Sequence, residues 1–324
     1  MEFLRYKRAQ GGYRLGVKIA GAIYDLADCY RAYRNAQGRR PPGVSAALAG
    51  ASLRALLASP GARAFLDALR GNGVCDGVCD GVGPLDGAAL VLGAPLHDPA
   101  RFIGIGLNYR SHAREIGQAI SSEPPLFAKW ANAIAGPYDD VTLPACSQAV
   151  DYEVELGVVI GRRAWQVAGK DALDYVFGYT VINDVSARDL QFRTGQWLAG
   201  KVSDGFAPMG PVVIEKDDVG PAQDLLLETW VNGDLRQQGR TSDMIHDVPA
   251  LVSHLSHLVT LEPGDVIATG TPPGVGMSRT PPCYLGVGDV VRMRITGIGV
   301  IENRFVAPLN QLPRFSHCTV TTSR

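Results

Sequence analysis

The sequence predicts an α+β, strand-rich fold with a smaller N-terminal region, and two observations support this. First, small-residue helical segments dominate residues 1–95, whereas short apolar runs separated by Gly, Pro and Asn dominate residues 100–310. Second, 324 residues that are 46% hydrophobic are enough for one large core, or for a large one and a small one. We therefore expect an N-terminal region (1–95), a main domain (100–310) and a polar C-terminal tail (311–324).

The N-terminal region combines two strand-like stretches with a helical part. The stretches 13–20 and 22–26 predict short strands, and helical periodicity is present at 45–48, 53–57 and 62–69. The Gly- and Asp-rich segment 71–86 indicates a loop. We find no group of side chains in this region that points to chemistry.

The main domain shows strand patterns at 102–107, 212–214, 228–231, 266–269 and 290–295. Asn232-Gly233 follows one of these runs and is a strong hairpin signal. Residues 248–258 predict an amphipathic helix with Pro249 in its first turn. We expect the tryptophans in the core rather than stacked on a cofactor: Trp130, Trp165, Trp197 and Trp230.

Composition narrows the class of partner. The chain has 31 basic and 32 acidic residues and a formal charge of −1, which gives no sign of a nucleic-acid partner and favours a small molecule. The charged start Met-Glu-Phe-Leu-Arg-Tyr-Lys-Arg does not resemble a signal peptide, and no apolar run approaches the roughly 18 residues that span a bilayer. We expect a cytoplasmic protein without membrane association.

The strongest chemical signal is a pair of glutamates in the apolar run 151–160. On a strand, Glu153 and Glu155 would project from the same face, because residues two apart do so. Two adjacent buried carboxylates require a proton or a cation between them. Asp184 follows the next apolar run, so the three residues predict an all-oxygen site for a hard divalent cation.

A second cluster follows the run 102–107. If 109–117 forms a helical turn, His112 and Glu115 lie on one face, and the carboxylate can orient the imidazole as a general base. The flanking Arg110 and Arg114 also fit a solvated helix face, and the local sequence leaves both interpretations open.

Positive and polar residues complete the candidate site. Arg188, Gln191 and Lys201 would hold an anionic substrate beside a metal, although simple charge balance is an alternative. Lys129 fits either a substrate contact or a structural ion pair. The Gly- and Pro-rich turn around Thr271 could present a hydroxyl and backbone N–H groups to a carboxylate, or could be an ordinary loop.

Taken together, these segments resemble the fumarylacetoacetate hydrolase family over roughly residues 100–310. The resemblance lies in six motifs: Gly-Leu-Asn-Tyr-x-x-His-x-x-Glu (106–115), Pro-x-x-Phe-x-Lys (124–129), Asp-Tyr-Glu-Val-Glu-Leu (151–156), Gly-Tyr-Thr-Val-x-Asn-Asp-Val-Ser-Ala-Arg-Asp-x-Gln (178–191), Gly-Gln-Trp-x-x-Gly-Lys (195–201) and Pro-Gly-Asp-Val-Ile-x-Thr-Gly-Thr-Pro-Pro-Gly-Val-Gly (263–276). Each motif alone is weak, and their joint occurrence is highly specific. Residues 1–95 match only loosely, as the family's variable N-terminal region.

The resemblance implies a catalytic domain built as a mixed β-sandwich roll and assembled as a homodimer. It also implies a divalent cation, with Mg²⁺ as first choice and Mn²⁺ or Ca²⁺ as alternatives, at the matching Glu153, Glu155 and Asp184. The family's His and Glu pair, on a mobile lid, matches His112 and Glu115. The remaining matches are its active-site arginine, glutamine and lysine (Arg188, Gln191, Lys201) and its substrate-carboxylate threonine (Thr271).

The function expected from this site is metal-dependent hydrolysis of a carbon–carbon bond in a 2,4-dioxo acid of the acylpyruvate, fumarylacetoacetate or fumarylpyruvate type. His112, Glu115 and Lys201 would then be catalytic. An alternative is oxaloacetate decarboxylation or a related lyase or tautomerase reaction on a 2-oxo acid, which uses nearly the same residues. A third is a non-catalytic protein stabilised by its metal, which would have no need of His112 and Glu115.

Overall fold

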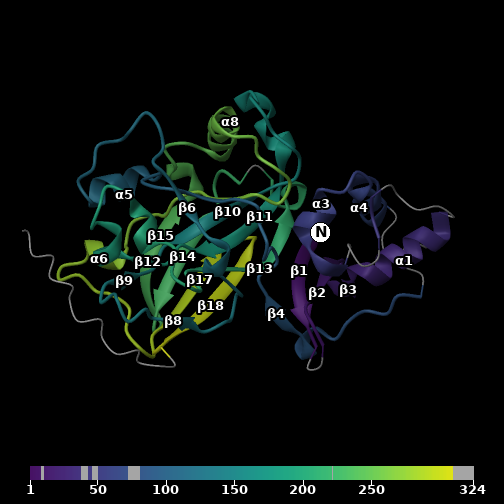
Figure 1. Cartoon of the computed structure of the whole chain (residues 1–324), viewed down its shortest axis with the longest axis horizontal. Coiled ribbons are helices and arrows are strands. Elements are labelled where there is room, and N and C mark those ends of the chain that lie inside the picture. Colours follow the sequence, from purple (N-terminus) through teal and green to yellow (C-terminus); the bar gives the residue numbers. More distant parts are fainter. Residues whose placement is uncertain (9–10, 38–42, 46–49, 72–80, 221, 309–324) are drawn as a thin grey trace, which may run out of the picture.

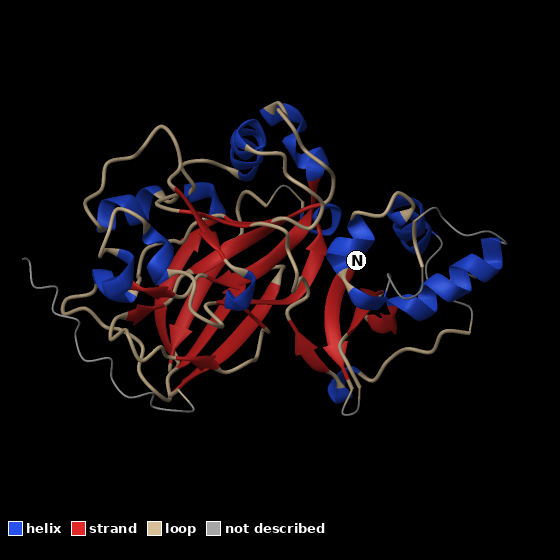
Figure 2. Cartoon of the chain, viewed as in Figure 1, coloured by secondary structure: helices blue, strands red, loops and turns tan. Residues whose placement is uncertain are grey.

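A computed structural model describes residues 1–8, 11–37, 43–45, 50–71, 81–220 and 222–308 of the chain (Figure 1). Most of the expected helix at 45–48, much of the expected loop at 71–86 and the expected tail at 311–324 fall outside the described residues. Strands form most of the regular structure, which confirms the α+β, strand-rich fold class (Figure 2).

The strands are β1 (Glu2–Lys7), β2 (Arg14–Ile19), β3 (Ala22–Asp25), β4 (Val91–Gly93), β5 (Phe102–Ile105), β6 (Leu126–Lys129), β7 (Ile134–Ala135), β8 (Val141–Thr142), β9 (Val150–Asp151), β10 (Val154–Ile160), β11 (Val176–Asn183), β12 (Ser186–Ala187), β13 (Ala207–Glu215), β14 (Leu226–Val231), β15 (Asp234–Arg240), β16 (Val266–Ala268), β17 (Val290–Ile295) and β18 (Gly299–Val306). The α-helices are α1 (Leu26–Gln37), α3 (Leu53–Leu57), α4 (Ala62–Gly71), α5 (Arg110–Glu115), α6 (Arg188–Gln191), α7 (Lys216–Val219) and α8 (Val248–Leu258). None of the helices among the described residues is long and apolar enough to cross a membrane.

The main sheet runs through both regions of the chain. Its order is β3-β2-β1-β13-β11-β10-β16-β5-β6, with β4 beside β1 and β7 beside β13. The N-terminal strands join it through β1 and β13, where Phe3 lies opposite Val213. Most neighbours are antiparallel, but β16 and β5 are parallel, so the sheet is mixed. The N-terminal strands therefore extend the sheet that carries the main domain.

A second sheet, in the order β15-β14-β17-β18-β8, packs across the centre of the first. Residues of β17 alternate between buried and exposed, with Met293 inward and Arg292 and Arg294 outward, because this sheet has one face toward the core. The expected hairpin at Asn232-Gly233 is confirmed: both residues have positive φ, at 53° and 88°, and they connect β14 to β15.

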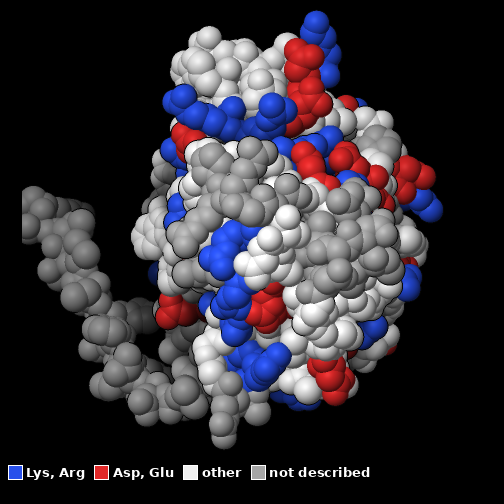
Figure 3. Space-filling view, turned by 90° about the vertical axis from the view of Figure 1, so that its right-hand side faces the viewer, with Lys and Arg blue, Asp and Glu red and all other residues white. Residues whose placement is uncertain are grey.

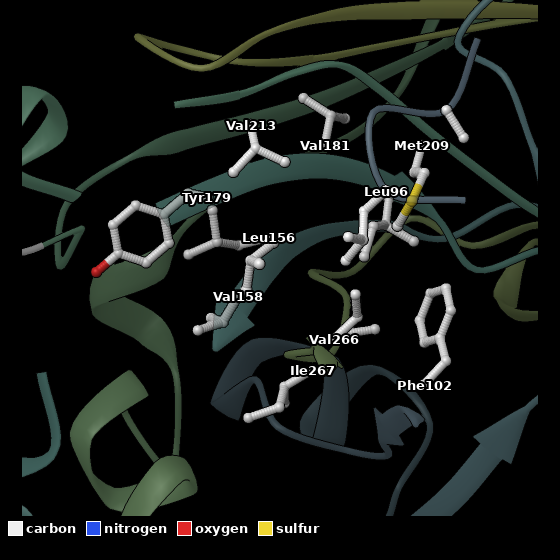
Figure 4. Packing of buried hydrophobic residues seen from close by; sticks show 14 of the residues in the cluster. Leu96, Phe102, Leu156, Val158, Tyr179, Val181, Met209, Val213, Val266 and Ile267 are labelled. Carbon is white, nitrogen blue, oxygen red and sulfur yellow. The ribbon is translucent and has the colours of Figure 1, made fainter. Parts of the chain in front are cut away.

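The core lies between the two sheets, and β10 is buried along its whole length. Leu156, Val158 and Val181 from β10 and β11 pack with Val266 and Ile267 of β16 (Figure 4). Strands buried on both faces read as continuous apolar runs. A carboxylate within such a run, as at Glu155, therefore sits at the centre of the fold.

The helix at 248–258 is confirmed as α8, which begins after an Asp247 side chain that accepts the N–H of Ala250. Several elements were not expected, among them the strand β1 and the helix α1. The end of the molecule formed by the N-terminal region carries both Lys or Arg and Asp or Glu side chains (Figure 3).

The expectation of buried tryptophans is wrong for two of them, since Trp130 is 55% and Trp165 53% exposed. Trp197 is partly exposed and lines a cavity. Trp230 is partly exposed on β14, where the guanidinium of Arg294 lies 5.4 Å from its ring centroid. Aromatic character alone does not determine on which side of a sheet or in which loop a ring lies.

Candidate active site

Most of the predicted site residues meet in one cavity of about 330 Å³. Its lining includes His112, Glu153, Glu155, Arg188, Gln191, Lys201 and Thr271. Asp184 and Glu115 lie directly behind this lining, bonded to Lys201 and His112 respectively. Larger hollows, among them those beside α4 and beside β6, are not lined by Glu153, Glu155 or Asp184. The chemical groups that line the cavity, rather than its volume, therefore identify it as the candidate site.

The strand register brings the three carboxylates together. Val154 of β10 lies opposite Asn183 of β11, so Glu153, just before β10, meets Asp184, just after β11. The N–H of Asp184 donates to the carbonyl of Glu153 at 2.9 Å. One oxygen from each of Glu153, Glu155 and Asp184 lies within 4.8 Å of the others, and all three residues are buried.

One detail of the expected strand is different. The run 151–160 is interrupted at Tyr152 and Glu153, so only Glu155 lies within β10. The side chain of Asp151 accepts the N–H of Tyr152 at 2.9 Å and N–H groups from Gly276 and Met277, which ends β9 there. Glu153 and Glu155 still converge, although Glu153 lies just before the strand.

Two buried cations pair with Glu153. Arg188 Nη2 donates to its Oε1 at 2.7 Å, and Lys201 Nζ donates to its Oε2 at 2.8 Å and to Asp184 Oδ2 at 2.6 Å. Burial would raise the pKa of Glu153, but the charges of Arg188 and Lys201 outweigh burial and lower it. Glu153 is thus a carboxylate at neutral pH.

Glu155 has no cation of its own. Its Oε2 accepts the N–H of Gly270 at 2.9 Å. Burial, followed by the charges of Asp184 and Glu153, raises the pKa of Glu155 well above its ordinary value. Without an added cation, Glu155 is therefore favoured in its neutral, protonated form, and its carboxylate form requires a cation that the described side chains do not supply.

A hard divalent cation fits this donor set. The three groups supply carboxylate oxygens, which are the ligands that Mg²⁺, Mn²⁺ and Ca²⁺ prefer. Such an ion would also stabilise the carboxylate form of Glu155 and would add positive charge that attracts an anion. Glu153, Glu155 and Asp184 are the residues that would hold it.

Lys129 does not lie where a substrate contact requires. Its ammonium is fully buried, 2.7 Å from Asp184 Oδ1, and donates to the carbonyls of Val185, Lys201 and Phe206. These four oxygens surround the ammonium, and Lys129 contacts Asp184 Oδ1 whereas Lys201 contacts Asp184 Oδ2. The geometry of Lys129 therefore favours the structural ion pair over the substrate contact, and it fits a residue that positions Asp184.

The opposite wall of the cavity carries the expected His and Glu pair. His112 Nδ1 lies 2.8 Å from Glu115 Oε2, and Glu115 Oε1 accepts the N–H of Gly274 at 2.9 Å. Burial would raise the pKa of Glu115, but the His112 and Gly274 hydrogen bonds lower it. Because an ionised carboxylate only accepts, Nδ1 of His112 carries the proton, and Nε2 is left as the base.

Arg188 orients Gln191. Its Nη1 donates to the Gln191 amide oxygen at 3.0 Å, while its Nε donates to Asp151 Oδ2 at 3.0 Å. A guanidinium has no acceptor, so the amide oxygen of Gln191 must face it, and the amide nitrogen is the donor left for the cavity. Gln191 is thus the member of this pair best placed to contact a substrate directly.

Thr271 is held by a residue that the sequence did not reveal. Its hydroxyl donates to the Val154 carbonyl at 2.9 Å and accepts from Gln237 Nε2 at 2.8 Å. Gln237 is fully buried on β15, and its amide oxygen also accepts from Val154 N. Since the one hydroxyl proton is already used, donation from Thr271 to a substrate would require this bond to break.

Sequence reasoning also missed Asp151, Phe127 and Trp197. Asp151 holds Arg188 and the turn at 276–277, and its only signal was its place in the same motif as the glutamates. Phe127 and Trp197 line the cavity as a pair of tilted rings 6.1 Å apart. Nothing in the sequence separates them from core aromatics.

Comparison with known proteins agrees with this geometry. Residues 101–306 match the family model "Fumarylacetoacetate (FAA) hydrolase C-terminal". The chain belongs to the fumarylacetoacetate hydrolase family. It is 47% identical over 215 residues, 66% of this chain and 68% of the relative, to the mitochondrial oxaloacetate tautomerase FAHD2B of Bos taurus.

Solved structures share the fold over nearly the whole chain. The fumarylacetoacetate hydrolase EaFAH from Exiguobacterium antarcticum matches with a TM-score of 0.77 and 37% identity, covering 95% of this chain and 100% of that one. Maleylpyruvate hydrolase from Sphingobium sp. SYK-6, solved with manganese(II) and pyruvate, matches with a TM-score of 0.72 and 30% identity, covering 95% and 99%. Membership in a family of such hydrolases and tautomerases indicates an enzyme rather than a scaffold.

Proposed function

We propose that the protein hydrolyses a carbon–carbon bond in a 2,4-dioxo acid with the help of a divalent cation, Mg²⁺ as first choice. The observation that supports this is the placement of two groups in one cavity: a buried cluster of three carboxyl groups whose oxygens converge, and an imidazole whose free Nε2 belongs to a carboxylate-oriented pair. The first suits an anion-binding cation and the second suits proton transfer to or from water.

The chemistry divides between the two walls. A divalent cation bound by Glu153, Glu155 and Asp184 would polarise the 2-oxo group and favour negative charge at C3. Nε2 of His112 takes a proton from water as the oxygen adds to C4. The C3–C4 bond then breaks, its electron pair forms the enolate of pyruvate, and the proton passes from His112 to C3. The products are a carboxylic acid and pyruvate, so atoms and charge balance.

The remaining residues position these groups. Lys201 stabilises negative charge beside Glu153 and Asp184. The amide nitrogen of Gln191, directed by Arg188, donates to a substrate oxygen, and Thr271, directed by Gln237, fixes the backbone of β10 next to Glu155. Lys129 holds Asp184 from behind.

The test follows the near-ultraviolet absorbance of acylpyruvates such as acetylpyruvate. Purified protein should bleach this absorbance with Mg²⁺, should lose activity after EDTA treatment, and should regain it when Mg²⁺ or Mn²⁺ is restored. Pyruvate should form in equal amount. No cation-dependent loss across several acyl groups would overturn the proposal.

A second candidate is oxaloacetate tautomerisation or decarboxylation, and the relative named oxaloacetate tautomerase is the observation that favours it. Tautomerisation requires only that His112 move a proton at C3, with no attacking water. Comparing His112→Asn and Glu115→Gln on acetylpyruvate and on enol-oxaloacetate would separate the candidates. A rate that changes only for oxaloacetate favours the tautomerase.

We also propose the cytoplasm as the compartment and a homodimer as the assembly. The family resemblance supports the homodimer. Cell fractionation and light scattering with an in-line size-exclusion column are the respective measurements. The proposed partner is a small anionic 2-oxo or 2,4-dioxo acid.

A further inference from the structure

The cavity has two chemically different halves. Its charged residues are nearly inaccessible, with Glu155 1%, Lys201 2% and Arg188 5% exposed. The lining that is more open to solvent is almost entirely apolar: Leu107, Ile116, Phe127, Phe192, Trp197 and Met277, with Gln118 as the polar exception. A substrate whose carboxylate and 2-oxo group lie against the inner, charged half must place its far end against this outer half.

The outer half starts directly at the charged cluster. Lys201 Nζ lies 4.6 Å from the centroid of the Phe127 ring, and the Trp197 ring follows at 6.1 Å from Phe127. Phe192, at 56% exposure, lies toward solvent. The rings of Phe127 and Trp197 thus form an aromatic wall that begins at the charged cluster.

Two glycines make room for this wall. A Cβ at Gly104 would lie 2.2 Å from the Phe127 ring, and one at Gly106 would lie 2.3 Å from the Trp197 ring. Neither glycine is needed for its φ angle, since neither has a positive φ. The close approach of a ring is therefore what these positions require, and it marks the aromatic wall as a built feature.

The cations that line the cavity form their ion pairs and hydrogen bonds within its inner half. Among the described residues that line it, Arg188 and Lys201 are the two cations. Arg188 bonds Asp151, Glu153 and Gln191, and Lys201 bonds Glu153 and Asp184. A second carboxylate at the far end of a substrate would lie against rings and aliphatic side chains and lose hydration without gaining a partner.

We infer that the outer half is an acyl subsite that accepts an uncharged, apolar group and disfavours a second carboxylate. This inference rests on the proposed function, and it narrows the substrate class from 2,4-dioxo acids in general to acylpyruvates with an alkyl, alkenyl or aryl acyl group. Phe127 and Trp197 are its specificity-determining residues.

The test uses a matched pair of substrates. Fumarylpyruvate and (E)-4-methylpent-2-enoylpyruvate have the same overall shape. At the distal end the first carries a carboxylate and the second an isopropyl group. We expect kcat/KM to be at least about tenfold higher for the neutral member. Along the series acetyl, propanoyl and butanoyl, kcat/KM should rise about fourfold per methylene group. Equal or better turnover of fumarylpyruvate would overturn the inference while leaving the hydrolase in place.

A binding measurement keeps the inference testable if no acylpyruvate is turned over. Calorimetry in the presence of Mg²⁺ compares the affinities of 5-methyl-2-oxohexanoate and 2-oxoglutarate. The first acid ends in an isopropyl group and the second in a carboxylate. Tighter binding of the neutral acid supports the apolar subsite even if the hydrolase proposal fails. Tighter binding of 2-oxoglutarate overturns it.

Substitutions in the aromatic wall test whether its rings cause the preference for an apolar acyl group. Trp197→Ala and Gly106→Ala should each lower the ratio of butanoylpyruvate to acetylpyruvate turnover several-fold, the first by removing the ring and the second by displacing it. Trp197→Phe should retain most of the ratio, and Trp197→Arg should shift preference toward fumarylpyruvate. Trp165→Ala, at an exposed tryptophan outside the cavity lining, is the matched control and should keep the wild-type ratio. An unchanged ratio in both Trp197→Ala and Trp197→Arg would contradict the assignment.

Discussion

The two walls of the cavity are built in opposite ways. The carboxylate wall lies between β10 and β11 at the centre of the main sheet, and a buried network of ion pairs holds it. The His112 wall is the six-residue helix α5, which is tied to the rest of the protein through a few groups: Glu115 to Gly274, Ser111 to Asp243, and Arg110 to the carbonyl of Met244. One wall fixes charge, and the other carries a proton-transfer group on a lightly held element.

This difference suggests separate tasks. Charged groups must be held rigidly, because electrostatic stabilisation depends on groups that are oriented before the reaction begins. A proton-transfer group can be carried on an element with few contacts, which is the kind of element that opens locally. Perturbing the first wall should therefore affect metal binding and stability together, whereas perturbing the second should affect rate with little effect on stability.

The largest expected effect comes from Glu155→Gln. Loss of a metal ligand should reduce activity by about 10³-fold or more, since a hard cation is worth several kcal/mol. The metal-free variant should be at least as stable as metal-free wild type, because burial raises the pKa of Glu155 and the amide resembles its neutral form. Calorimetric melting and Mg²⁺ titration measure both effects. Glu153→Gln is the matched control and should melt lower, because it breaks pairs with Arg188 and Lys201.

His112→Asn should lower kcat by about 10²- to 10³-fold, the usual worth of a general base. Mg²⁺ affinity and melting temperature should stay close to wild type, because His112 bonds Glu115 rather than the carboxylate cluster. Steady-state kinetics and Mg²⁺ titration are the measurements. Loss of metal binding in this variant would show that the two walls are not separate.

Lys201→Met should destabilise the metal-free protein by about 3 kcal/mol, because one partner of a buried ion pair leaves the others uncompensated. Urea unfolding measures the change. Arg163→Met is the control: its pair with Glu262 is exposed, so it should change stability by about 1 kcal/mol or less. Similar values for both variants would contradict the distinction between buried and exposed pairs.

Asp243→Ala tests the tether of α5. Asp243 Oδ2 accepts the N–H of Ser111 at 2.9 Å in the first turn of the helix. Its loss should cost about 1 kcal/mol, typical of a terminal hydrogen bond to a helix, and should lower kcat several-fold. The exposed Asp224→Ala is the control. If kcat stays at the wild-type value in Asp243→Ala, the tether is irrelevant to catalysis.

The smallest effect is a pH dependence at Glu115. Its pKa in the folded protein is lowered from the ordinary 4.5, so its stabilising contribution is complete above pH 4.5 and is lost as pH falls through the lower folded value. The difference in melting temperature between wild type and Glu115→Gln should thus shrink from pH 6 toward pH 3. A difference that grows on acidification would show the opposite sign of shift.

Several features could be predicted because they depend on neighbours in the sequence. Asn232-Gly233 requires only the local turn chemistry, and α8 requires only the spacing of its apolar residues after Asp247. The pairing of His112 with Glu115 follows from one helical turn. The sequence predicts these features correctly because each depends on residues within four positions of each other.

Other features depend on contacts between distant segments. Strand β1 has a charged sequence, and its place in the sheet follows from pairing with β13, more than two hundred residues away. Gln237 holds Thr271 only because β15 lies over the turn that follows β16. Trp130 and Trp165 face solvent, although their residue type favours the core. No local pattern contains this information.

By itself, the sequence determined the chemical inventory of the site: three carboxylates at Glu153, Glu155 and Asp184, a His and Glu pair, and nearby cations. Residue type and short-range spacing decide which groups are present and which ion they suit. The tertiary structure alone decided their pairing: Lys129 lies behind Asp184, Arg188 holds Gln191, and Glu155 remains without a cation. Charge compensation depends on distances across the sheet, and those distances are set only when the strands pair.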